Sequence, residues 1–347
     1  MGDHGGCDRY AHAYAFVSTT VYVLELGGQD DDFAVFEAES AASDVQRLAP
    51  GLATARGVTD RVRSLAFTRA ASELLGRCDP DVESARTLLD ATTIQRTGTV
   101  AVRAEDIRGK TGVDTQRAER VLGQLLVDRG FDVDLDDPDH ELRVLFAGSD
   151  GADGNGTCAV GWLVAKSVRD YGERKPTDRP YFQPGSMDPL LARALANVAG
   201  ARPGATVLDP MCGTGGILIE AGLVGARVVG TDAQQQMVEG TRANLAAFLD
   251  GDFHVARADA RSLPVADGGV DAVVFDAPYG RQSKIEGNIH DLMSEALTEA
   301  RRVAPRCVVV GDRPWARTAS GAGWTTEAAF QRRVHKSLTR YVLALRR

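Results

Sequence analysis

Four aspartates in the second half of the sequence each end a short apolar run: Asp209, Asp232, Asp259 and Asp276. The runs predict β-strands, and helical patterns, one of them over residues 236–249, separate the first three of these acids. Strands that alternate with helices form a parallel, doubly wound sheet, and ligands bind at the carboxyl ends of its strands. We therefore expect the four carboxylates to line one rim as a ligand site. One aspartate alone would more simply cap a helix or a turn, but four in series favour the site.

The first aspartate opens a glycine turn at residues 209–216, which reads Asp-Pro-Met-Cys-Gly-Thr-Gly-Gly. A helical run follows at residues 217–224. Glycines let the backbone approach a bound molecule closely, and a helix start offers N–H groups without helical partners. The turn therefore predicts a ligand cradle, although a tight strand-to-helix turn without a ligand has the same composition. Cys212 is expected to pack rather than to react, because no His or Asn nearby in sequence would activate it.

The last aspartate begins the sequence Asp276-Ala277-Pro278-Tyr279. These residue types suit the alkylation of an exocyclic amine on a nucleobase, a poor nucleophile because its lone pair is delocalised into the ring. A carboxylate and a neighbouring backbone carbonyl can accept both N–H bonds and hold the nitrogen in line with an electrophilic methyl group. Pro278 stiffens the turn, and Tyr279 can stack on a base that has left its helix. The plain alternative is a capping aspartate, a turn proline and a core tyrosine.

With these residues the chain resembles the amino-methylating branch of the class I S-adenosylmethionine-dependent methyltransferases, whose motif is Asp/Asn/Ser-Pro-Pro-Tyr/Phe. Ala277 replaces the second motif residue and keeps its backbone carbonyl, and Gln183 stands where the family often has His. The resemblance implies S-adenosylmethionine as the cofactor, with Asp232 on the ribose hydroxyls and Asp259 on the adenine amine. It implies four catalytic residues: Asp276, Ala277, Pro278 and Tyr279. The implied cofactor-binding residues are Pro184, Gly185, Ser186, Met187, Asp209, Met211, Cys212, Gly213, Thr214, Gly215, Asp232, Asp259, Ala260 and Asp276.

A dinucleotide-binding enzyme is the rival interpretation, since Asp232 stands at the distance from the glycine turn that a ribose-binding acid would have. The turn, however, has Gly-Thr-Gly-Gly after Asp-Pro-Met-Cys and lacks the spacing Gly-x-Gly-x-x-Gly. Asp-Ala-Pro-Tyr after the fourth strand also has no place in a dehydrogenase. Both differences favour the methyltransferase.

The first half of the sequence predicts small α+β modules made of short strands and helices. The predicted strands are at residues 20–26, 46–48, 98–104 and 141–146, and the predicted helices at residues 33–42, 82–89 and 115–129. Residues 99–104, 125–131 and 138–144 resemble parts of a THUMP domain, an RNA-binding module, which a small ferredoxin-like unit precedes.

Together with Asp-Ala-Pro-Tyr-Gly-Arg-Gln-Ser at residues 276–283 and Gln-Pro-Gly-Ser-Met at residues 183–187, this half makes the chain similar to the archaeal tRNA guanosine-10 N2-methyltransferase family. Members of that family methylate the exocyclic amine of a guanosine in the tRNA core once or twice. The resemblance therefore implies tRNA as the partner. Close relatives modify guanosine-6 or ribosomal RNA with the same architecture, so the position on the RNA is left open.

Periodicity, composition and the resemblance together predict a division of the chain into five segments. Residues 1–19 are expected to be disordered, 20–60 to form the ferredoxin-like unit, 61–165 the THUMP-like RNA-binding domain, 166–184 a linker and 185–347 the methyltransferase domain. The last is expected to be an α/β, doubly wound, Rossmann-like domain with a mostly parallel seven-stranded sheet. Its closing antiparallel hairpin is predicted from two runs, at residues 325–334 and 338–345.

The net charge of −8 at first argues against a nucleic-acid partner. Only five of the 40 basic residues are lysine, however, which is typical of a protein from a high-salt cytoplasm, although GC-rich coding also favours arginine. Charge is also uneven, since residues 301–347 hold eleven basic residues against two acidic ones. The basic residues expected to contact RNA are Arg174, Lys175, Arg179, Arg281, Arg332, Arg333, Lys336 and Arg340. A non-catalytic tRNA-binding protein is the alternative of another class, and it would bind RNA without transferring a methyl group.

The five cysteines are scattered and form no Cys-x-x-Cys pair, so neither a zinc site nor a disulfide framework is expected. No run approaches the roughly 18 apolar residues of a membrane span, and the N-terminus does not read as a signal peptide. We expect a monomeric, cytoplasmic enzyme with no metal and no membrane partner.

Overall fold

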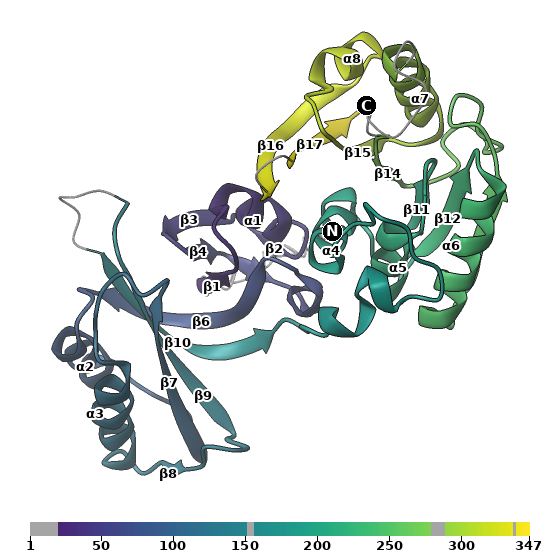
Figure 1. The fold of residues 1–347 in the computed structure, drawn as a ribbon. Coiled ribbons are helices and arrows are strands. Elements are labelled where there is room, and N and C mark those ends of the chain that lie inside the picture. Colours follow the sequence, from purple (N-terminus) through teal and green to yellow (C-terminus); the bar gives the residue numbers. More distant parts are fainter. Residues whose placement is uncertain (1–19, 151–155, 279–288, 336–337) are drawn as a thin grey trace, which may run out of the picture.

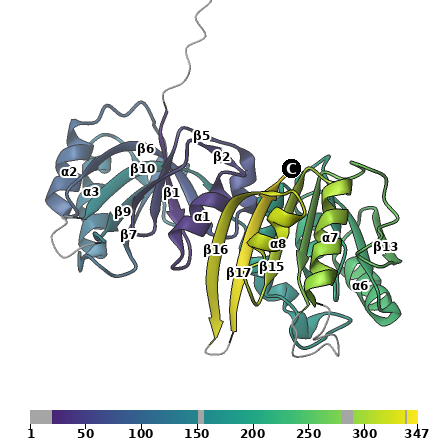
Figure 2. The ribbon, with the colours of Figure 1, turned by 90° about the horizontal axis from the view of Figure 1, so that it is seen from above.

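The computed structural model describes residues 20–150, 156–278, 289–335 and 338–347. They form two parts, each built on one large sheet, and the parts lie side by side (Figures 1 and 2). Within the described ranges, no helix is both long and apolar enough to cross a bilayer.

The first part contains an eight-stranded sheet in the order β3-β4-β1-β6-β10-β9-β7-β8. Its strands are β1 (Tyr22–Leu26), β3 (Gln46–Ala49), β4 (Leu52–Ala55), β6 (Thr68–Cys78), β7 (Thr99–Ile107), β8 (Asp132–Val133), β9 (His140–Ala147) and β10 (Thr157–Lys166). Strand β6 pairs antiparallel with β1 on one side and with β10 on the other. Strands of both units predicted within residues 20–165 therefore share one sheet, and the boundary between those units stays a prediction.

The remaining elements of the first part are α1 (Asp31–Ala38), α2 (Val82–Ala91), α3 (Thr115–Val127), a 3-10 turn (Asp60–Ser64) and a separate two-stranded sheet of β2 (Ala42–Ser43) and β5 (Gly57–Val58). Asp114 caps α3, because its side chain accepts a hydrogen bond from the N–H of Arg117. The buried residues of α3 recur every four positions, as a helix packed on one face requires: Ala118, Leu122 and Leu126. This stripe packs α3 against the sheet.

The second part contains a seven-stranded sheet in the order β13-β12-β11-β14-β15-β17-β16. Its strands are β11 (Thr206–Asp209), β12 (Arg227–Asp232), β13 (Phe253–Arg257), β14 (Ala272–Asp276), β15 (Arg306–Gly311), β16 (Thr325–His335) and β17 (Leu338–Arg346). All neighbours from β13 to β15 pair in parallel, whereas β17 pairs antiparallel with β15 and β16. The predicted doubly wound sheet and its closing hairpin are confirmed.

Helices cover both faces of this sheet (Figure 1): α4 (Pro189–Ala199), α5 (Gly216–Leu223) and α6 (Gln235–Phe248) lie on one face, and α7 (Ile289–Val303) and α8 (Ala316–Gly321) on the other. Strand β14 is therefore apolar at successive positions. Val273 and Phe275 pack into the core with α7 and α8, while Ala272 and Val274 pack into the core with α4 and α5. By the same alternation, Asp276 points to the face that α4 and α5 cover.

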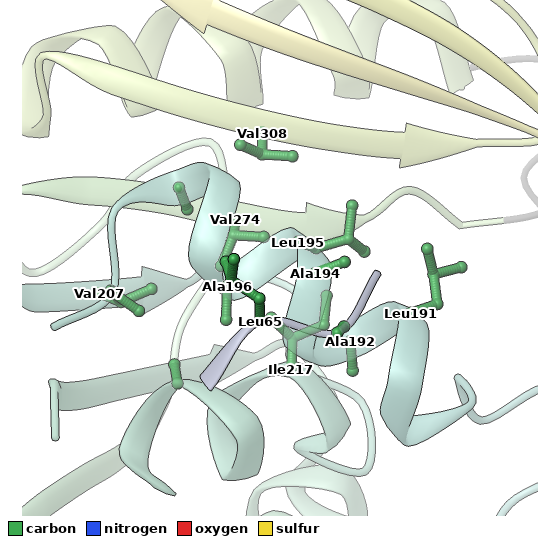
Figure 3. Close-up of a cluster of buried hydrophobic side chains, with 14 of the residues drawn as sticks. Leu65, Leu191, Ala192, Ala194, Leu195, Ala196, Val207, Ile217, Val274 and Val308 are labelled. Carbon is green, nitrogen blue, oxygen red and sulfur yellow. The ribbon is translucent and has the colours of Figure 1, made fainter. Parts of the chain in front are cut away.

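The two parts share a buried interface between α1 and α4. Glu37 on α1 is fully buried and accepts hydrogen bonds from Nδ2 of Asn197 on α4 (2.7 Å) and from the N–H groups of Ala66 and Phe67 (both 2.7 Å). Burial raises the pKa of Glu37. Figure 3 shows Leu65, from the first part, in one core with side chains of α4. The RNA-binding half predicted from the sequence is thus packed directly on the second part.

Candidate active site

A cavity of about 340 Å³ opens at the carboxyl ends of β11, β12 and β14. Three of the four predicted acids line it: Asp209, Asp232 and Asp276. The other lining residues are Gln183, Pro184, Gly185, Ser186, Met187, Met211, Cys212, Gly213, Thr214, Gly216, Ile217, Gln234, Met237, Ala277 and Pro278. The cavity thus occupies the rim at which doubly wound sheets bind ligands.

The glycine turn leaves room for a ligand because two of its residues adopt positive φ, 52° at Gly213 and 78° at Gly215. A Cβ at Gly213 would meet no atom within 4 Å, so this residue borders open space. At Gly215 a Cβ would lie 2.9 Å from Thr241, so a side chain is excluded there. Helix α5 begins at Gly216 without a side-chain cap, and its first N–H groups are therefore offered to a ligand.

Two polar residues of α6 stabilise this turn by donating hydrogen bonds to its carbonyl groups. Oγ1 of Thr241 donates to the carbonyl of Gly213 (2.6 Å), and Nδ2 of Asn244 donates to the carbonyl of Thr214 (2.9 Å). Asn244 also joins the turn to the segment before α4, since its side chain exchanges two 2.8 Å hydrogen bonds with the backbone of Tyr181. Sequence reasoning missed both residues. The available signal was a polar pair three positions apart on the buried face of an otherwise apolar stripe.

Residues 184–187, which the resemblance implies as cofactor-binding, lie beside the glycine turn. Oγ of Ser186 donates to the carbonyl of Gln183 (2.7 Å) and lies 3.0 Å from Oγ1 of Thr214. Nε2 of Gln183 donates to the hydroxyl of Tyr181 (2.9 Å). Pro184 to Met187, predicted as cofactor-binding, therefore line the same cavity as the turn.

Asp209 and Asp232 differ in their environments. Asp209 is buried and accepts a hydrogen bond from the N–H of Met211 (3.0 Å). Burial, together with the charges of Asp232 and Asp276, raises the pKa of Asp209 well above its usual range. The carboxylate of Asp232 accepts hydrogen bonds from the N–H groups of Gly213 (3.0 Å) and Gln234 (2.9 Å), which fix it at the cavity wall. Burial also raises the pKa of the Cys212 thiol, in keeping with the packing role expected for it.

Asp259 does not line this cavity. Its carboxylate binds the guanidinium of Arg261 (2.6 Å) and is 46% exposed, and these hydrogen bonds lower its pKa. Ala260, next to it, is buried. The contact of Asp259 with an adenine amine therefore stays a prediction, and it would require the carboxylate to share or leave Arg261.

The turn after β14 carries Asp276 to the rim. The N–H of Ala277 donates to the carbonyl of Val310 on β15 (2.7 Å), which anchors the turn to the neighbouring strand. Nη2 of Arg340, on β17, lies 3.6 Å from Oδ2 of Asp276. The sequence analysis placed Arg340 among the RNA contacts and missed this pairing. Tyr279, predicted to stack on the base, lies outside the described residues.

Comparison with known proteins places this arrangement in a family. A family model described as "RMKL-like, methyltransferase domain" matches residues 176–341. The tRNA (guanine(10)-N2)-dimethyltransferase of Methanothermobacter thermautotrophicus is 34% identical over 292 residues, which are 82% of this chain and 84% of that protein. The chain belongs to the tRNA (guanine(10)-N2)-dimethyltransferase family.

Two further comparisons bear on substrate and fold. The tRNA (guanine(6)-N2)-methyltransferase of Thermus thermophilus is 32% identical over 225 residues, 62% of this chain and 63% of that protein. Among solved structures, SMU.472 in complex with SAH aligns with a TM-score of 0.50 at 12% identity, covering 94% of this chain and 97% of that one. The structural likeness shows the fold.

The cofactor of this methyltransferase is S-adenosylmethionine. The residues of the cavity fit it. Open space at Gly213 and the uncapped start of α5 suit the carboxylate of its methionine part, and Asp232, on the cavity wall, would accept hydrogen bonds from the ribose hydroxyls. The three carboxylates of the rim suit the positive charge of the sulfonium. The individual assignments stay predictions. Within the described part of the chain, no three His, Cys, Asp or Glu side chains group as metal ligands.

Several basic residues expected on an RNA surface are buried instead. Arg174, in the segment predicted as a linker, is 4% exposed and pairs with Glu220 (2.8 Å) and Asp170 (2.9 Å). Arg179 is also buried, and its guanidinium lies against Gly216 at the start of α5. Neither presents its guanidinium on the surface of the free protein, and their RNA contacts stay predictions. Through Glu220 on α5, Arg174 joins its segment to the second part, whereas Nη1 and Nη2 of Arg179 are buried without a hydrogen-bond partner among the described residues.

Arg332 joins the two parts of the molecule. Its guanidinium lies over the rings of Phe33 (4.7 Å) and Phe67 (4.5 Å) and pairs with Asp30 (3.1 Å), all from the first part. Desolvation by this burial lowers its pKa. Lys175 and Arg333 are exposed and remain RNA-contact predictions. Arg281 and Lys336 lie outside the described residues.

Proposed function

We propose that this protein transfers methyl groups from S-adenosylmethionine to the N2 amine of guanosine-10 in tRNA, and that it adds one or two to the same nitrogen. The observation that carries the proposal is the match to a curated tRNA (guanine(10)-N2)-dimethyltransferase over more than four fifths of both chains. The position of Asp276 at the edge of the cofactor cavity supports it, because the amine must meet the methyl group there.

In this mechanism the cofactor supplies an electrophilic methyl group on a positively charged sulfur. Asp276 accepts hydrogen bonds from the amine, and the backbone carbonyl that follows it accepts the second N–H, so the nitrogen lone pair is aimed at the methyl carbon. As the nitrogen bonds to the methyl carbon, the carbon–sulfur bond would break and the sulfur would leave as a neutral thioether. The nitrogen then becomes strongly acidic, and the ionised carboxylate takes its proton. A second transfer needs the remaining N–H to be presented to Asp276 in the same way.

The first part of the molecule is proposed to be THUMP-like and to bind the tRNA. The target base lies in the folded core of the tRNA and must be extruded, which costs a few kcal/mol. Binding by the first part would supply this free energy and fix the distance from the RNA to Asp276. The packing of α1 on α4 through Glu37 and Asn197 supports such a fixed distance. The lysine-poor, acidic composition further supports a protein of a high-salt archaeal cytoplasm.

Guanosine-6 is the second candidate position, favoured by the match to the guanine-6 enzyme over about three fifths of both chains. Labelled methyl transfer to three tRNA transcripts separates the two. We expect incorporation into the unchanged transcript and into one with guanosine-6 replaced by adenosine, and loss of incorporation when guanosine-10 is replaced. If incorporation of the labelled methyl group depended on guanosine-6 instead, the target would be guanosine-6. RNA binding without any incorporation would indicate a non-catalytic binding protein. The variant Asp276→Ala serves as the inactive control, and Asp252→Ala, on an exposed acid, as the matched active one.

A further inference from the structure

The side chain that chooses guanine over the other bases is the open question, because adenine and cytosine also carry exocyclic amines. An acid alone accepts N–H from any of them. A second polar group beside Asp276 would be needed to read the atoms next to the amine. The described structure places Arg340 in that position.

The strand register explains why Arg340 reaches Asp276 from two strands away. The Cα partner of Asp276 on β15 is Val310, and the partner of Val310 on β17 is Val342. Val274, Val310 and Val342 all belong to the core beneath α4, so the side chains at these positions of the three strands point to the same face of the sheet. Because β17 runs antiparallel, the residue two positions before Val342 lies further toward the rim on the same face, and this residue is Arg340.

The guanidinium of Arg340 is held in a protein environment with little solvent. Its side chain is 7% exposed, that of Asp276 is 22% exposed, and the two groups approach to 3.6 Å. Arg340 is also the Cα partner of Arg332, which the first part holds between two phenylalanine rings. A donor with fixed geometry therefore stands beside the acceptor that the reaction needs.

This donor and acceptor match one edge of guanine. That edge presents the N2 amine and N1–H as donors and O6 as an acceptor. Adenine, placed with its amine at the acid, would offer N1 as an acceptor and then a C–H, and cytosine would offer two acceptors. A carboxylate therefore disfavours the ring nitrogen of both other bases, and adenine would place a C–H, which cannot accept a hydrogen bond, opposite the arginine.

We propose that Arg340 donates a hydrogen bond to O6 of the target guanine while Asp276 accepts those of the N2 amine and N1–H. The inference rests on the proposed function and names the residue that gives it guanine specificity. Arginine is the side chain that most often recognises O6 of guanine in protein–DNA complexes, and such contacts discriminate against other bases.

The test varies the side chain and the base atom together. Full-length protein is assayed on ligated tRNA that carries either guanosine or 6-thioguanosine at the methylated position, which weakens the acceptor and keeps N1–H and the N2 amine. We expect the wild type to lose roughly 10- to 100-fold in kcat/KM on the thio substrate. Arg340→Met should lose a similar factor on guanosine and then show no further loss on 6-thioguanosine. Arg340→Lys, which keeps a donor, should restore part of the preference.

Arg346→Met is the matched control, because Arg346 lies at the other end of β17 with its side chain 54% exposed, and it should keep the wild-type ratio. Equal rates of wild type on both substrates would overturn the proposal, whatever the variants do. An unchanged preference in Arg340→Met or, if that variant binds no cofactor by calorimetry, an unchanged preference in Arg340→Gln would also overturn it. Failure of the proposed function looks different, since no methylation of guanosine would then be seen with the wild type.

Discussion

The two turns that form the site, after β11 and after β14, are supported in different ways. The glycine turn after β11 is held locally, by Thr241 and Asn244 on α6. The turn after β14 is held across the sheet, by Val310 on β15 and by Arg340 on β17. The hairpin that carries Arg340 also touches the first part of the molecule through Arg332. In the proposed function, cofactor binding therefore depends on the neighbouring units β11–α5 and β12–α6, whereas base recognition depends on segments far apart in the chain.

The largest effect is expected from a substitution in the turn after β14 that leaves the glycine turn unchanged. Asp276→Ala removes the acceptor for the amine and should lower kcat by on the order of 100-fold to 1,000-fold, since such directed charges contribute this much in other enzymes. The affinity for S-adenosylmethionine should change little, because the glycine turn stays intact. Single-turnover rates and calorimetry on one preparation check both. Near-normal turnover would remove Asp276 from the catalytic role.

The converse experiment removes a side chain that supports the glycine turn after β11. Asn244→Leu leaves the carbonyls of Thr214 and Tyr181 without their buried donor and should cost about 1–3 kcal/mol of folding stability. Because the turn then loses its fixed shape, cofactor affinity should fall roughly in step with that loss, about 10-fold or more. Denaturant unfolding and calorimetry give the two values. Wild-type cofactor affinity in a folded variant would show that α6 does not shape the cradle.

Arg332→Ala tests whether the contact between the hairpin and the first part of the molecule affects RNA binding. The guanidinium stacks on two rings and pairs with Asp30, so its loss should cost about 1–2 kcal/mol of stability. We expect KM for tRNA to rise several-fold while cofactor affinity stays constant. Arg56→Ala, at a side chain that is 76% exposed, is the control. A variant with unchanged KM for tRNA would mean that the hairpin does not link RNA binding to the catalytic turn.

The smallest effect is a pH dependence carried by Asp209. Its pKa in the folded protein is raised above the ordinary value of 3.8 by burial and neighbouring charge. The folded state therefore holds this proton more tightly than the unfolded chain, and the associated stability is lost as the pH rises from about 3.8 through the raised pKa. Asp209→Asn removes this loss, so its free energy of unfolding should fall less with rising pH than that of the wild type. Parallel pH profiles would refute the assignment.

The sequence predicted the elements whose signals are local. The strand-end acids, the glycine turn and the closing hairpin all follow from residue type and spacing, and the sheet and its hairpin are confirmed. Strands β6 and β10 were missed because they are central in the first sheet, and their partners come from distant parts of the chain. The same reason explains Arg174 and Arg340. A sequence shows that an arginine is present, but whether it faces solvent or pairs with Glu220 or Asp276 depends on tertiary contacts.

The most direct measurement is mass-spectrometric mapping of tRNA after incubation with the wild-type protein and S-adenosylmethionine. The account predicts N2-methylguanosine and N2,N2-dimethylguanosine at position 10, with the dimethylated form increasing as the monomethylated form is consumed. Methylation found exclusively at guanosine-6, in ribosomal RNA or on adenine would contradict the assigned target. The absence of any methylated nucleoside, with intact cofactor binding, would contradict the catalytic role of the rim itself.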